Sequence, residues 1–128
     1  MALNNPYTAY SQYKQNNIML ASPQELTLML YNGAIKFANQ AILAIDEKNI
    51  PKAHEAIVRA SDIIIHLNST LDMKYEVSNG LSQLYDFITH QLQEANIKKD
   101  KQILVELLPI LTELRDTWKE AMNLAKKA

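Results

Sequence analysis

The amino-acid sequence predicts an all-α fold: an antiparallel, up-down-up-down four-helix bundle that follows a loosely ordered N-terminal arm. Apolar residues recur three and four positions apart over four long segments, which is the period of amphipathic helices. The chain of 128 residues holds only 2 Gly and 4 Pro, while 48% of its residues are hydrophobic. This composition favours long helices over a turn-rich β fold. Because the links between the segments are short, successive helices must run antiparallel.

The first 21 residues differ from the rest of the chain. They are polar, rich in Asn and Gln, and carry Tyr7, Tyr10 and Tyr13. We interpret residues 1–21 as an arm and residues 22–128 as the bundle domain, since a chain of this length fits one core. A tyrosine can bury its ring while its hydroxyl keeps a hydrogen bond, which makes it common at interfaces.

The first helix is predicted to span residues 23–46 and to end in a polar turn at residues 46–49. Ser22 can cap this helix, and Pro23 suits the first helical position. Glu25 completes a capping box with Ser22. The start of this helix is therefore the most clearly marked boundary of the chain.

Three further helices follow from the same spacing. The second is predicted to begin near Pro51, and residues 73–79 are predicted to form a loop because Gly80 is a poor residue for a helix interior. Asp100 is expected to cap the fourth helix. Pro109 falls on the polar side of that helix, so we expect a bend that leaves the core stripe intact. The apolar positions of these helices are Ala53, Ala56, Ile57, Ala60, Ile63, Ile64, Leu67 and Leu71, then Leu81, Leu84, Tyr85, Ile88, Leu92 and Ala95, then Ile103, Leu107, Leu111, Leu114, Trp118 and Ala121.

The first helix is apolar on two faces that lie almost opposite each other at about 100° per residue. The first stripe, the expected core face, is Leu26, Met29, Leu30, Gly33, Phe37, Ala41 and Ala44. The second stripe is Leu28, Tyr31, Ile35, Ala38 and Ile42. A bundle helix needs only one such stripe. The second is therefore either a groove for an amphipathic partner helix, or apolar surface that the arm covers or that extends the core against the fourth helix. An arm could also cover the groove until a partner displaces it.

Other classes of function are disfavoured by composition and motifs. The chain has no Cys and a net charge of -1, which argues against thiolate chemistry and against a nucleic-acid or membrane-surface binder. It contains no Glu-x-x-His metal motif, nucleophile elbow or phosphate loop. We therefore expect no enzyme, no metal and no cofactor. A secretory signal and a membrane span are also not recognisable, so the cytoplasm is the expected compartment.

Several segments resemble the flagellar export chaperone family FliS, in the right order along nearly the whole chain. They are residues 5–10 (NPYTAY), 22–26 (SPQEL), 29–34 (MLYNGA), 84–87 (LYDF), 94–97 (EANI) and 114–118 (LRDTW). Each motif alone is weak, but together they are specific. Pro109 departs from the family pattern and leaves the straightness of the fourth helix in question.

The resemblance implies a four-helix bundle that binds the disordered C-terminal region of flagellin in the cytoplasm. Binding would prevent premature polymerisation and present the subunit to the flagellar type III export gate. The resemblance also implies that the N-terminal arm covers apolar surface in the free protein, a role that falls on Tyr7 and Tyr10. Together with the second stripe, this makes Leu28, Tyr31, Ile35, Ala38 and Ile42 the expected flagellin-binding residues.

A different class of protein would also explain a second apolar stripe. A self-associating structural bundle would hide that stripe in a homodimer. The chaperone interpretation instead expects the free protein to be a monomer or a weak dimer. Sizing at low micromolar concentration distinguishes the two.

Overall fold

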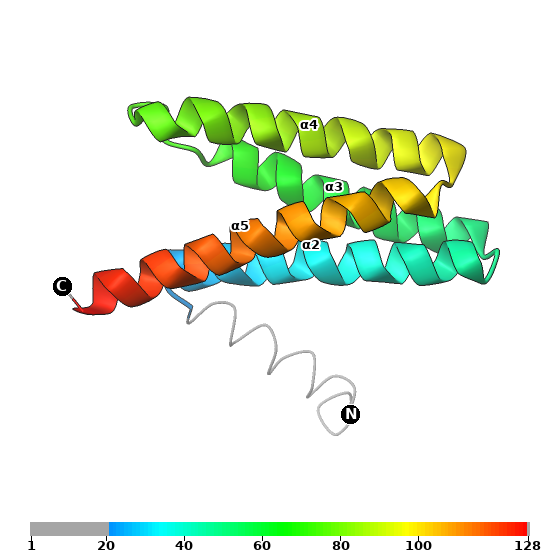
Figure 1. Cartoon of the computed structure of the whole chain (residues 1–128), viewed down its shortest axis with the longest axis horizontal. Helices are drawn as coiled ribbons and strands as arrows, with labels where there is room; N and C mark the ends of the chain where they lie inside the picture. The colour runs from blue at the N-terminus through cyan, green and yellow to red at the C-terminus, as the bar shows by residue number, and fades with distance from the viewer. Residues whose placement is uncertain (1–20, 128) are drawn as a thin grey trace, which may run out of the picture.

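The computed structural model describes residues 21–127, and every regular element in this part of the chain is an α-helix. The helices are α2 (Pro23–Asp46), α3 (Ile50–Ser69), α4 (Glu76–Lys98) and α5 (Lys101–Lys127). Successive helices run in opposite directions, and α2 and α4 each pack against both α3 and α5 (Figure 1). The predicted all-α bundle is confirmed, whereas the predicted arm with Tyr7 and Tyr10 lies outside the described residues. No helix within residues 21–127 is long and apolar enough to cross a membrane.

Local capping explains where most of the helices begin. The Oγ of Ser22 accepts a hydrogen bond from the backbone N–H of Glu25 at 3.2 Å, so α2 starts where the sequence predicts. Asn49 caps α3 in the same way through the N–H of Lys52 at 3.2 Å. At the start of α5, Asp100 accepts from the N–H of Gln102 at 3.0 Å, as predicted.

The start of α4 differs from the prediction, because residues 76–79 are helical rather than part of the loop. Ser78 is buried, and its hydroxyl donates to the carbonyl of Asp72 at 2.7 Å, which ties the first turn of α4 to the preceding loop. Gly80 is consequently inside the helix, where nothing lies within 4 Å of the position that a Cβ would take. Pro109 lies inside α5 and is exposed, as predicted, while the bend it should cause stays a prediction.

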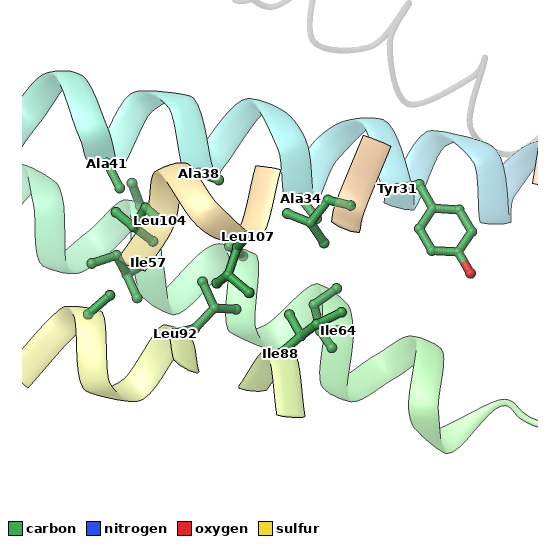
Figure 2. Close-up of a cluster of buried hydrophobic side chains, with 14 of the residues drawn as sticks. Tyr31, Ala34, Ala38, Ala41, Ile57, Ile64, Ile88, Leu92, Leu104 and Leu107 are labelled. Atoms are coloured by element: carbon green, nitrogen blue, oxygen red, sulfur yellow. The ribbon is translucent and has the colours of Figure 1, made fainter. Parts of the chain in front are cut away.

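The buried residues of α2 are mostly alanines, and large residues from α3, α4 and α5 fill the core. The interface between α2 and α3 is the most extensive in the bundle, and both helices bury several alanines. They are Ala34, Ala38, Ala41 and Ala44 of α2, with Ala53, Ala56 and Ala60 of α3. The largest fully buried side chains are Ile57, Ile64, Ile88, Leu92, Leu104, Leu107 and Leu111. All of them except Leu111 are labelled in Figure 2. Alanine ridges allow close helix approach, so the bulk of the core comes from α3, α4 and α5.

The two stripes of α2 do not separate into one buried face and one open face. Tyr31 and Ala38 of the second stripe are 4% and 1% exposed, whereas Met29 of the first stripe is 41% exposed. Ala34, which belongs to neither stripe, is fully buried.

The buried arc of α2 is therefore centred between the two stripes. The reason is that α2 packs against two neighbours, α3 and α5, rather than against one. The first stripe faces α3, since a Cβ on Gly33 would lie 3.2 Å from Cδ1 of Ile63. Tyr31 of the second stripe instead faces α4 and α5. Tyr31 and Ala38 therefore extend the core, which was one of the two interpretations of this stripe. Ile35 and Ile42 are half-buried and pack against the core, and Leu28 is half-buried.

Candidate partner-binding groove

An apolar hollow of about 410 Å³ lies between α2, α4 and α5. It forms because α4 and α5 meet at their short link and diverge toward the N-terminal end of α4 (Figure 1). The residues that line this hollow, called the α4–α5 groove below, are Tyr31, Leu81, Leu84, Ile110, Glu113, Leu114, Thr117, Trp118 and Ala121. Most of them are aliphatic or aromatic, so the groove offers apolar surface to water or to a partner.

The walls of the groove are half-buried rather than fully buried. Leu81 and Leu84 of α4 face Ile110 and Leu114 of α5, and all four pack against the core while keeping part of their surface open. Covering such surface contributes roughly 25 cal/mol per Å² of apolar area. A complementary apolar segment would therefore be stabilised here without any change in the core beneath.

Trp118 forms a fixed part of the wall near the open end. Its indole N–H donates to the backbone carbonyl of Gln24 at 2.9 Å, which holds the ring against the first turn of α2. Trp118 is also the only tryptophan of the chain. The groove therefore contains a single, well-positioned aromatic side chain of the kind that often dominates partner binding.

Beneath the groove, the hydroxyls of Tyr31 and Tyr85 form a hydrogen bond that links α2 to α4. The two residues are 4% and 2% exposed. Burial raises the pKa of the Tyr31 phenol above its ordinary value of 10.0, although the bond to Tyr85 opposes the rise. Burial also raises the pKa of Tyr85, with further contributions from the bond to Tyr31 and its charge. Both side chains are neutral near physiological pH, and their hydrogen bond joins α2 to α4 beneath the groove.

The side chains that line the groove are mainly apolar, with a few polar groups. Within residues 21–127, no group of three or more His, Cys, Asp and Glu side chains is placed to hold a metal ion. The groove itself contains one carboxylate, from Glu113, and the hydroxyls of Thr117 and Tyr31 among apolar neighbours. An apolar groove with a polar edge is suited to the apolar face of a helix.

The structure brings only one of the sequence-predicted binding residues, Tyr31, to the groove. From the sequence, the groove residues of α4 and α5 were predicted to belong to the core, because half-buried and fully buried residues recur with the same helical period. A usable signal was present in the fourth helix. Ile110, Leu114, Trp118 and Ala121 form a second apolar line beside the fully buried line of Leu104, Leu107 and Leu111.

The fold and the groove define a class of small all-α bundle that leaves an apolar groove open between two of its helices. A model of the family described as "Flagellar protein FliS" matches residues 6–125. The chain belongs to this family, the FliS flagellar secretion chaperones, as its resemblance to them indicates.

Relatives and a solved structure agree with this assignment. The flagellar secretion chaperone FliS of Bacillus subtilis is 42% identical over 127 residues, which are 99% of this chain and 93% of the relative. The protein of the same name from Vibrio cholerae is 37% identical over 105 residues, covering 80% and 77%. A crystal structure described as a flagellar chaperone from bacteria has a TM-score of 0.74 at 21% identity, covering 93% of this chain and 98% of that chain. This last similarity shows the shared fold.

Proposed function

We propose that this protein is an export chaperone that binds the disordered C-terminal region of flagellin in the cytoplasm. Binding would prevent premature polymerisation and present the subunit for flagellar type III export. The observation that supports this most is an open, half-buried apolar groove in a member of a flagellar secretion chaperone family. The bound flagellin segment adopts helical structure, because only a helix satisfies its own backbone hydrogen bonds while presenting an apolar face.

The energetics are those of coupled folding and binding. Ordering a disordered tail costs several kcal/mol, so a large apolar contact must supply the gain. The α4–α5 groove provides one part of that contact. The half-buried edge of α2, formed by Leu28, Ile35 and Ile42, is proposed as a neighbouring part. Removal of free tail by mass action prevents self-association without ATP.

Trp118 provides a direct test of the binding site. We expect a flagellin C-terminal peptide without tryptophan to bind one-to-one and to shift the fluorescence emission of Trp118 to the blue, because the peptide excludes water from the ring. Calorimetry should show a negative heat-capacity change from apolar burial. Flagellin that lacks its C-terminal tail serves as the control and should leave the emission unchanged.

Two results would contradict this proposal in different ways. Calorimetric binding with unchanged Trp118 emission would place the partner elsewhere on the bundle. Equal binding of intact and tail-deleted flagellin would exclude the C-terminal region as the ligand. Sizing of the free protein tests the alternative, because a tight dimer at low micromolar concentration would favour a self-associating bundle whose groove is hidden between two copies.

A further inference from the structure

The charges of α5 are separated between its faces. Glu106, Glu113 and Glu120 are exposed and recur every seven residues, so they form one row with a spacing of about 10.5 Å. Two of the cations of α5, Lys101 and Arg115, contact α2 instead. The Nζ of Lys101 is 2.7 Å from Oδ1 of Asp46, and the Nη1 of Arg115 is 3.5 Å from Oδ1 of Asn32.

The acidic row meets the groove at Glu113, which lines it. Glu106 and Glu120 lie two turns to either side of Glu113 on the same face of α5, and Glu120 lines a neighbouring hollow of α5 together with Glu113. The opposite wall contributes little positive charge, since the only Lys or Arg of α4 is Lys98 in its last turn.

None of the ion pairs within the described part of the chain includes these three glutamates, and the next position at the same spacing is Lys127, in the last turn of α5. The ion pairs between residues 21 and 127 are Glu55–Arg59, Glu94–Lys98, Asp46–Lys101 and Arg115–Asp116. The α4–α5 groove is thus an apolar channel with a periodic negative edge along one wall.

Resting on the proposed function, we infer that the flagellin segment in this groove is an amphipathic helix with a basic flank. Its apolar face covers Leu84, Ile110 and Leu114, and Lys or Arg side chains spaced about seven residues apart along one flank pair with Glu106, Glu113 and Glu120. The seven-residue spacing fits because two turns of the bound helix and two turns of α5 advance by the same distance. Near-parallel packing of the two helices keeps the rows in register.

The acidic row would fix the register of the bound helix more than its affinity. A groove of aliphatic side chains alone permits a helix to slide, since one leucine resembles the next. A slip of one full repeat would lose one of three ion pairs, and a shorter slip would turn basic side chains into the apolar hollow. Exposed pairs are individually weak, so the three together should contribute about three- to tenfold in affinity, together with faster association at low salt.

A charge-matched pair of variants tests this inference on the full-length protein. The test variant is E106Q/E113Q/E120Q. The control is E47Q/E55Q/D62N, which changes the net charge by the same amount at exposed positions at the end of α2 and on α3, away from the groove. Binding of the flagellin C-terminal peptide is measured by calorimetry at low and high salt, with thermal melts to confirm that both variants remain folded.

The expected result is wild-type affinity that falls as salt rises. The test variant should bind about three- to tenfold more weakly at low salt with a flatter salt dependence, while the control retains the wild-type behaviour. If the two variants bind alike, the acidic row is outside the interface, although the chaperone proposal stands because the peptide still binds. If the wild-type protein does not bind the peptide at all, both proposals fail.

Discussion

Tyr31 and Tyr85 connect two helices that are distant in sequence through one hydrogen bond between buried hydroxyls. A buried hydroxyl without a partner costs about 1–3 kcal/mol, so each tyrosine makes the other tolerable in the core. This pairing also shows why spacing alone misplaced Tyr31. Helical spacing placed the residue on the second stripe, whereas its hydrogen-bond partner lies 54 positions away and no local pattern reveals it.

The raised pKa values of these two phenols predict how stability depends on pH. Because both pKa values lie above 10.0 in the folded state, the unfolded chain loses its phenolic protons first. The contribution of the pair is therefore fully present below about pH 10 and is lost as pH rises further. In an alkaline absorbance titration, Tyr31 and Tyr85 should ionise only as the helical signal is lost. A Y31F/Y85F variant should lack this late phase. If all six tyrosines ionised near pH 10 while the helices stayed intact, the burial of Tyr31 and Tyr85 would be contradicted.

At the scale of the element, caps and spacing identified all four helices, and the start of α2 was predicted correctly from Ser22. The start of α4 was missed because its first turn is held by a bond from Ser78 to the loop carbonyl of Asp72, a contact that periodicity does not contain. The two faces of α2 were separated incorrectly because a helix with two neighbours buries a wider arc than one stripe. Local signals therefore define where helices are, but not which neighbours they contact.

The two glycines of the chain should respond differently to substitution by alanine. Gly80 is exposed inside α4 and has open space where a Cβ would be, so Gly80→Ala should raise the free energy of unfolding by about 0.5–1 kcal/mol. Gly33 lies against α3, where a Cβ would approach Cδ1 of Ile63 at 3.2 Å. Gly33→Ala should therefore gain less, or lose stability. Urea unfolding of both variants measures the difference, and an equal gain at the two sites would contradict the close packing of α2 on α3.

At the scale of the whole molecule, the bundle was predictable and its groove was not. Four amphipathic segments with short links leave little choice of fold. The divergence of α4 from α5, however, results from the packing of all four helices and has no counterpart in a single stripe. The sequence therefore indicated that apolar surface is left over for a partner, but assigned it to α2. The structure instead places the open hollow between α4 and α5, with Tyr31 as the shared residue.

If the partner helix occupies the α4–α5 groove, a charge introduced at Ala121 should weaken its binding. Ala121 is exposed and lines the groove, whereas Ala125, one turn further along α5, is exposed and lies beside Ser22 and Gln24 instead. Either alanine replaced by Asp should change the stability of the free protein by no more than about 0.5 kcal/mol.

The deciding measurement is the affinity of Ala121→Asp and Ala125→Asp for the flagellin C-terminal peptide. A carboxylate in the groove must lose water when the apolar face of the peptide covers it, which costs a few kcal/mol. Ala121→Asp should therefore bind at least about tenfold more weakly than the wild-type protein, while Ala125→Asp should bind as the wild-type protein does. Equal affinities of the two variants, with equal melting temperatures, would contradict the placement of the partner in this groove.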